Sequence, residues 1–155
     1  MLTAKMTDFG YSCFGTDDSD IVYLPCSLPW AAPEYHSRGF MLRDAKKMDV
    51  YSFGMLCLYI LFRECLEDPT SSWVCSSFCS PVCSPVCSSI CYLEGLKKVS
   101  GSLVGFANKA VSRSTLLKEM QKDSLKAFFE STLSDEPGSR NVDFKTLIEH
   151  LGRQE

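Results

Sequence analysis

The stretch AKKMDVYSFGMLCLYILFREC, residues 45–65, decides the fold because it predicts one long helix in the middle of a core. Apolar side chains recur along it at steps of three or four residues, and further apolar side chains fill the remaining faces. The recurring positions are Val50, Phe53, Leu56, Cys57, Ile60 and Leu61, and the others are Met55, Leu58, Tyr59 and Phe62. A helix that is apolar nearly all round belongs inside a core. Its strongly apolar run, residues 51–62, is too short to cross a bilayer, so we expect no membrane span.

Weaker patterns flank this helix on both sides. Residues 1–8 alternate in part and predict a short strand, residues 11–31 show no period and predict a long loop, and residues 32–37 fit one or two helical turns. Residues 115–133 predict an amphipathic helix, and residues 142–151 predict a last one. The expected core side chains of the 115–133 helix are Leu116, Met120, Leu125, Phe128 and Phe129. The fold class expected is therefore mainly α.

Composition limits the kind of protein. With 155 residues, 45% hydrophobic and 23% charged, the chain fits one modest globular domain. Its net charge of −3 argues against nucleic acid or an anionic membrane as the main partner. No apolar run follows the first lysine, so we expect no secretory signal. We therefore expect an intracellular, cytoplasmic location, where thiols stay reduced. Four cysteines lie among apolar residues and are expected to be buried thiols, namely Cys13, Cys26, Cys57 and Cys65.

Three short motifs follow one another in order: DFG at Asp8–Gly10, APE at Ala32–Glu34, and DVYSFG at Asp49–Gly54. Each alone is common, but the ordered set resembles the C-terminal lobe of the protein-kinase family, well over residues 1–66 and loosely over residues 115–151. The resemblance implies an incomplete kinase-like lobe with a short strand or hairpin, an activation segment, a buried central helix, and two or three further helices. It also divides the chain into 1–68 and 94–155, both of the lobe, with an insert at 69–93.

The resemblance gives the first motif a role in binding Mg²⁺ and ATP. Asp8 matches the carboxylate that holds Mg²⁺ against the nucleotide phosphates, Phe9 matches a side chain packed in the interior, and Gly10 permits a backbone turn. Residues 11–31 match the activation segment. Its candidate phosphate acceptors are Ser12, Thr16, Ser19, Tyr23 and Ser27. Three neighbouring aspartates, at 17, 18 and 20, would repel a phosphate there unless a cation compensates.

The second and third motifs match structural and substrate-contacting positions. CSLPWAAPE resembles the loop on which kinases dock a protein substrate, with Ser27, Pro29 and Trp30 as its candidates, and Ser27 favours a serine/threonine type. In the family, the APE glutamate pairs with an arginine near the end of the lobe, and Glu34 and Arg140 match this pair. Asp49 matches the residue that anchors the catalytic loop. Taken singly, Asp8 also fits a turn or a helix N-cap. Glu34 and Arg140 also fit a surface ion pair, and Asp49 also fits the cap of a buried helix.

The other catalytic motifs of the kinase family have no match at the corresponding places in this sequence. Phosphoryl transfer needs a glycine-rich loop, a phosphate-binding lysine and an HRD catalytic loop, all of which precede DFG in the family. Leu42–Arg43–Asp44 follows APE and lacks the asparagine, and Gly101–Gly105 lacks the full glycine pattern. We therefore expect this chain to be inactive alone. The alternative is a non-catalytic kinase-like remnant that binds a protein partner or a second copy through exposed core residues, with Leu58, Ile60 and Phe62 expected to be partly exposed.

A cysteine tract interrupts the lobe. Cys75, Cys79, Cys83, Cys87 and Cys91 repeat every four residues within a stretch without charge. Pro81 and Pro85 argue against a helix, and the uniform repeat with no nearby histidine is not typical of a zinc site. The favoured interpretation is a low-complexity insert without a defined fold, ahead of metal binding and of lipidation or redox use.

Overall fold

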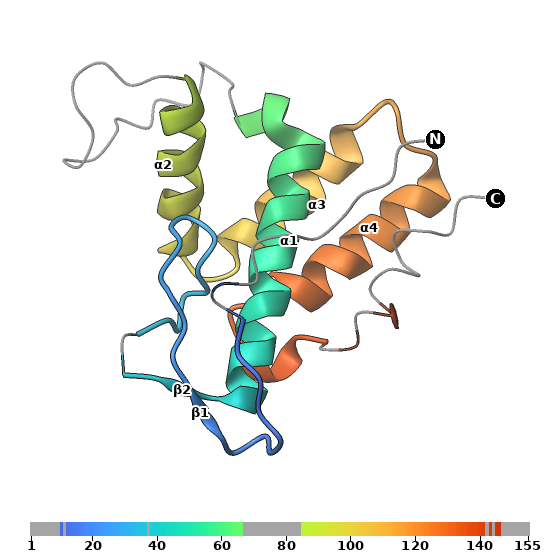
Figure 1. Cartoon of the computed structure of the whole chain (residues 1–155). Helices are drawn as coiled ribbons and strands as arrows, with labels where there is room; N and C mark the ends of the chain where they lie inside the picture. Colours follow the sequence, from blue (N-terminus) through green and yellow to red (C-terminus); the bar gives the residue numbers. More distant parts are fainter. Residues whose placement is uncertain are drawn as a thin grey trace.

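Helix α1, Leu42–Leu66, runs through the middle of the molecule, and the other elements pack around it (Figure 1). The computed structural model describes residues 10, 12–36, 38–66, 85–141, 143 and 145–146, with the backbone alone for 85–90. The described chain is mainly helical. The remaining elements are β1 Ile21–Val22, β2 Phe40–Met41, α2 Pro85–Lys97, α3 Ser102–Arg113, α4 Glu119–Thr132 and the 3₁₀ turn η2 Pro137–Ser139.

The predicted central helix is confirmed, and it starts at Leu42 rather than at residue 45. The first amides of a helix have no partner within the helix and need acceptors from elsewhere. Here the Leu42 amide donates to the Asp20 carbonyl oxygen over 2.8 Å, and the Arg43 amide donates to that of Asp18 over 3.1 Å. Asp44 in the first turn and Arg63 in the last turn suit the helix dipole.

The core lies between α1, α3 and α4. Phe53 and Phe62 of α1 meet Phe128 and Phe129 of α4, with ring centroids 5.9 and 6.1 Å apart. Because α4 covers this face, Phe62 is buried, and so is Leu58, so the expectation that these two would be exposed is wrong. The expectation holds for Ile60, which is 67% exposed.

Gly54 lets α4 approach α1 closely. A Cβ at this position would lie 2.5 Å from Thr132 Oγ1 and 2.7 Å from Thr132 Cβ. Thr132 cannot move away easily, since it is fully buried and its hydroxyl donates to the Phe128 carbonyl oxygen over 2.9 Å. The glycine of the DVYSFG motif is therefore required by helix packing.

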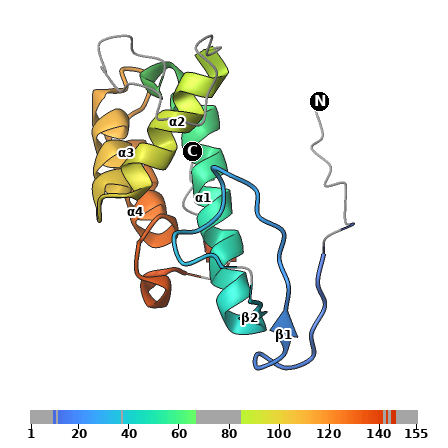
Figure 2. The ribbon, with the colours of Figure 1, turned by 90° about the vertical axis from the view of Figure 1, so that its left-hand side faces the viewer.

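Segment 12–32 lies on the side of α1 opposite α3 and α4 (Figure 2). Within the predicted loop, β1 pairs with β2 in antiparallel register, Ile21 with Met41 and Val22 with Phe40. This ladder ties the segment to the start of α1. Residues 32–36 form a turn, with the Tyr35 amide bonded to the Ala32 carbonyl oxygen, and not the predicted helical turns.

The helices after α1 depart most from the sequence expectation. The predicted 115–133 helix starts at Glu119, where Gln121 Oε1 accepts the Lys118 amide, and Leu116 and Met120 are 92% and 78% exposed rather than in the core. Helix α3 was not predicted. Helix α2 begins inside the tract expected to lack a fold, because a proline is tolerated at a first helical position. The predicted strand 1–8 and most of the predicted helix 142–151 lie outside the described residues.

The scattered cysteines were expected to be buried, and the structure corrects three of them. Cys13, Cys26 and Cys65 are exposed, and Cys57 is half-buried. Cys13 and Cys26 lie in the segment that borders solvent on the far side of α1, and Cys65 lies in the last turn of α1 between the exposed Glu64 and the buried Leu66. Within the described ranges, no helix is long and apolar enough to cross a bilayer.

Candidate functional site

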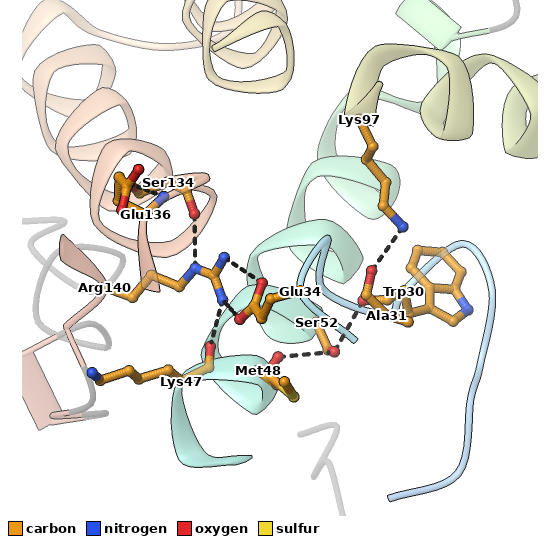
Figure 3. Close-up of polar contacts among 10 residues, drawn as sticks. All are labelled: Trp30, Ala31, Glu34, Lys47, Met48, Ser52, Lys97, Ser134, Glu136 and Arg140. Carbon is orange, nitrogen blue, oxygen red and sulfur yellow. Dashed lines mark hydrogen bonds and ion pairs between the residues drawn. The ribbon is translucent and has the colours of Figure 1, made fainter. Parts of the chain in front are cut away.

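Three consecutive carbonyl groups, those of Pro29, Trp30 and Ala31, each accept a hydrogen bond from a helix. Figure 3 shows the bonds to Trp30 and Ala31. The Ser52 hydroxyl of α1 donates to the Trp30 oxygen over 3.0 Å. The Lys97 ammonium of α2 donates to the Pro29 and Ala31 oxygens over 2.8 and 2.7 Å. The loop that the sequence predicts to contact substrate is thus fixed through its backbone.

The next residues of the same segment lead to an ion pair. Glu34 accepts two bonds from Arg140, 2.5 Å from Nη1 to Oε1 and 3.0 Å from Nη2 to Oε2 (Figure 3). The Arg140 side chain has no exposed surface, and its Nε donates to the Ser134 carbonyl oxygen over 2.7 Å. A bidentate arginine–carboxylate pair of this kind is geometrically specific. The two expected partners, Glu34 and Arg140, therefore meet in the structure.

The aromatic ring of Tyr51 packs against the Arg140 side of this ion pair. The Arg140 guanidinium carbon lies 4.7 Å from the centre of the Tyr51 ring, a cation–π contact. Burial raises the pKa of Tyr51, and the nearby Arg140 charge opposes that rise only in part. Among the described residues the Tyr51 hydroxyl has no hydrogen-bond partner, so its contribution here is that of the ring face.

Asp49 borders a cavity of about 550 Å³ between segment 12–32 and the start of α1. The cavity wall also carries Ser27, Trp30 and Ser52. Partial desolvation raises the pKa of the Asp49 carboxyl. No hydrogen bond or ion pair to Asp49 occurs within the part of the chain that the structure describes. The carboxylate is thus placed at the cavity with its acceptor capacity unused there.

The acidic part of the predicted activation segment is a closed turn. Asp20 Oδ2 accepts the amides of Thr16 and Asp17, and Asp17 Oδ1 accepts the amide and the hydroxyl of Ser19. These bonds from Ser19 lower the pKa of Asp17. Lys46 of α1 pairs with Asp18 over 2.7 Å. A cation does lie beside these aspartates, but it is already engaged by one of them.

Most of the remaining predicted site residues are either exposed or lie outside the residues that the structure describes. Gly10 is exposed, and so are all five candidate phosphate acceptors, Ser12, Thr16, Ser19, Tyr23 and Ser27. Asp8 and Phe9 lie outside the described residues, as do the side chains of Cys75, Cys79, Cys83 and Cys87, while Cys91 is half-buried. Over the described ranges, no three histidine, cysteine or acidic side chains come together as a metal site.

Comparison with known proteins gives one partial similarity. The chain is 37% identical over 62 residues to a protein of Arabidopsis thaliana named "Probable LRR receptor-like serine/threonine-protein kinase". Over this stretch the chain is kinase-like. The match covers 39% of this chain and 6% of the relative, so the chain spans a small part of that protein's length. No family model matches the chain, and no solved structure does.

Sequence reasoning missed two of the residues that build this site. Ser52 stands inside the DVYSFG motif, so the motif itself was the available signal. Lys97 lies after the charge-free stretch in a helix that was not predicted, and no local pattern distinguishes it from its exposed neighbour Lys98. Its role depends on a contact between residues 66 and 68 positions apart.

Proposed function

We propose that this chain is the substrate-docking part of a protein-kinase-like C-terminal lobe. The family's function is ATP- and Mg²⁺-dependent transfer of a phosphoryl group to protein hydroxyls, with serine or threonine favoured by Ser27. The observation that carries the proposal is the bidentate Glu34–Arg140 pair, which joins positions 106 apart. The family resemblance implies this pair, and the 62-residue similarity to a receptor-like kinase supports the same family.

The docking role rests on the loop 27–31. Its backbone oxygens are tied to α1 and α2, whereas the Leu28 side chain is 65% exposed and Ser27 is exposed. A fixed backbone that presents side chains outward is a pre-organised surface for an extended peptide, because little order is lost when the peptide binds. The substrate we propose is therefore a short protein segment bearing a serine or threonine.

Phosphoryl transfer by this chain alone is not part of the proposal. The chemistry depends on positioning and charge stabilisation by a glycine-rich loop, a lysine and a catalytic aspartate and asparagine, which the 155 residues do not carry in the family's order. ATP and Mg²⁺ are implied by the family, and Asp8 is the residue we propose for Mg²⁺. One carboxylate does not supply the rest of the site.

A second candidate function is a non-catalytic protein-binding module. The observation in its favour is an apolar patch on α1, formed by Leu56, Ile60 and Leu61, which are 43%, 67% and 51% exposed. Leu56 and Ile60 are four residues apart and lie on one face of the helix. Covering such a patch with a partner or a second copy stabilises the complex through apolar burial.

A transfer assay and a binding assay separate these functions. The full chain is incubated with radiolabelled ATP, Mg²⁺ and an array of serine- and threonine-centred peptides, in parallel with an Asp8→Asn variant. We expect no transfer by either protein, and retention of labelled wild-type chain on a subset of peptides. Transfer that requires Asp8 would overturn the claim of inactivity, and retention on no peptide would overturn docking and leave the binding-module candidate.

A further inference from the structure

Lys97 holds the docking loop more completely than a surface lysine could. An ammonium group has three N–H donors. Here one points to the Pro29 oxygen, one to the Ala31 oxygen and one to Glu94 Oε1, at 2.8, 2.7 and 2.8 Å. The side chain is only 8% exposed. All three donors are therefore used, two in the contact between α2 and the loop and one in the bond to Glu94 within α2.

We propose that Lys97 is a positioning residue that sets the conformation of loop 27–31 and thereby couples α2 to substrate docking. This proposal rests on the proposed function for its docking part. The positioning part rests on the geometry alone, since Glu94 supplies the opposite charge and the two carbonyl oxygens supply the specificity. Among the described residues, Lys97 shares no hydrogen-bonding partner with the Glu34–Arg140 pair.

The loop has a second attachment, and this makes the effect of Lys97 separable. Ser52 holds the Trp30 oxygen from α1, and the Trp30 ring packs edge-on against Tyr59 with centroids 5.6 Å apart. With Lys97 removed, the loop keeps this anchor on one side and loses both flanking ones. We therefore expect local loosening of residues 27–31 while α3 and α4 keep their packing.

The first test compares Lys97→Met with Lys98→Met in the full chain. Methionine keeps the length of the stem and removes the donors, and Lys98 is the exposed neighbour in sequence. Hydrogen exchange is followed by mass spectrometry at the loop, where the Ala31 amide is bonded to the Ser27 oxygen over 3.0 Å. We expect at least tenfold faster exchange in the loop of Lys97→Met, with α3 and α4 unchanged, and wild-type exchange in Lys98→Met. Equal exchange in the two variants would overturn the proposal.

A second measurement needs no variant of Lys97 and covers the case in which Lys97→Met fails to fold. In the unaltered chain, an amine reagent can modify Lys97 only after its ammonium releases the two oxygens. Modification of Lys97 should therefore be at least tenfold slower than that of Lys98, and should accelerate together with loop exchange as urea is added. Modification of both lysines at one rate would overturn the proposal.

Peptide binding distinguishes the failure of this inference from the failure of the proposed function. If Lys97→Met loosens the loop and weakens binding of the array peptides at least tenfold, both stand. If the loop loosens but wild-type chain binds no peptide, positioning by Lys97 stands and docking fails. If peptides bind equally to wild type and Lys97→Met and the loop is unchanged, docking stands and the inference about Lys97 fails.

Discussion

The guanidinium of Arg140 and the carboxylate of Glu34 form two parallel hydrogen bonds, although the two residues are 106 positions apart in the chain. The pair fastens the segment after η2 to the segment before α1, and the Tyr51 ring lies against it. It therefore joins the two halves of the chain that the cysteine tract separates in sequence.

Breaking this pair should destabilise the fold strongly. Removal of one partner of a buried pair leaves the other charge desolvated and costs about 3–5 kcal/mol. We expect Glu34→Gln and Arg140→Met each to lower the free energy of unfolding by an amount near that range. The Glu34 change should be the larger, because it leaves the fully buried Arg140 charge unpaired, whereas Arg140→Met leaves Glu34, whose side chain is 27% exposed to water. Urea unfolding of both single variants and of the double variant gives their coupling, expected at about 1–3 kcal/mol.

Glu136→Gln is the matched control for this cycle, since Glu136 is exposed and lies near Arg140 in sequence. A surface change of this kind should stay within about 0.5 kcal/mol of wild type. A coupling between Glu34 and Arg140 no larger than this control value would contradict the pair's structural role.

Alanine substitution at two glycines should have opposite signs. Gly54→Ala places a methyl group 2.5 Å from Thr132 Oγ1, and overpacking of this kind costs about 1–3 kcal/mol. Gly105→Ala in α3 adds a methyl group with nothing within 4 Å, and the gain in helix propensity should stabilise by about 0.5–1 kcal/mol. Thermal unfolding of both variants checks this. Stabilisation by Gly54→Ala would show that α1 and α4 do not cross this closely.

Asp49 should make stability depend on pH in a defined direction. Its pKa in the folded chain lies above the ordinary value of 3.8, so the folded state favours the protonated form. The resulting stabilisation is present below pH 3.8 and is lost as the pH rises through the raised pKa. Asp49→Asn should therefore be more stable than wild type at pH 7, and this difference should shrink on acidification. Urea unfolding between pH 3 and pH 7 measures it.

Asp17→Asn serves as a comparison, because the pKa of Asp17 is shifted in the opposite direction to that of Asp49. Bonds from the Ser19 amide and hydroxyl lower the pKa of Asp17, so its ionised form is the one that the fold favours. This variant should be no more stable than wild type at pH 7. If Asp49→Asn and Asp17→Asn shifted stability in the same direction at that pH, desolvation of Asp49 would be the wrong explanation.

Self-association through α1 should respond to Ile60. The chain has a mass of 17.3 kDa. Light scattering on the wild-type chain should give an average mass that rises above this monomer value as the protein concentration is increased. Ile60→Asn removes apolar surface that an interface would bury and should weaken association about tenfold or more. Met120→Asn, at an exposed position of α4, should behave as wild type. A wild-type chain that stays monomeric at every concentration would remove the support for the binding-module candidate.

Sequence alone predicts the features that depend on local periodicity or on short motifs. The period of residues 45–65 predicts α1, and the resemblance to the kinase family implies the pairing of Glu34 with Arg140. The rest depends on distant contacts. Leu58 and Phe62 are buried because α4 covers them, and Leu116 is exposed because α4 starts only at Glu119. Helix α3 did carry a signal, since Leu103, Ala107, Ala110 and Val111 fall on one helical face.

Loop 27–31 shows the same division between what its sequence predicts and what distant contacts determine. Trp30 and Pro29 were placed in it from the motif, but the bonds that hold it come from Ser52 and Lys97. Neither bond follows from the identity of the loop residues, because both are made to backbone oxygens that every residue carries. Only the packing of α2 beside the loop brings the Lys97 ammonium to them.

The affinity of the chain for a serine-centred peptide selected from the array tests the central claim most directly. Leu28 and Leu116 are both exposed leucines, at 65% and 92%, but only Leu28 lies in loop 27–31. Fluorescence anisotropy with wild type, Leu28→Asp and Leu116→Asp compares them at unchanged fold. We predict that Leu28→Asp weakens peptide binding at least tenfold and that Leu116→Asp leaves it within about twofold. Equal affinities for all three proteins would contradict docking on this loop.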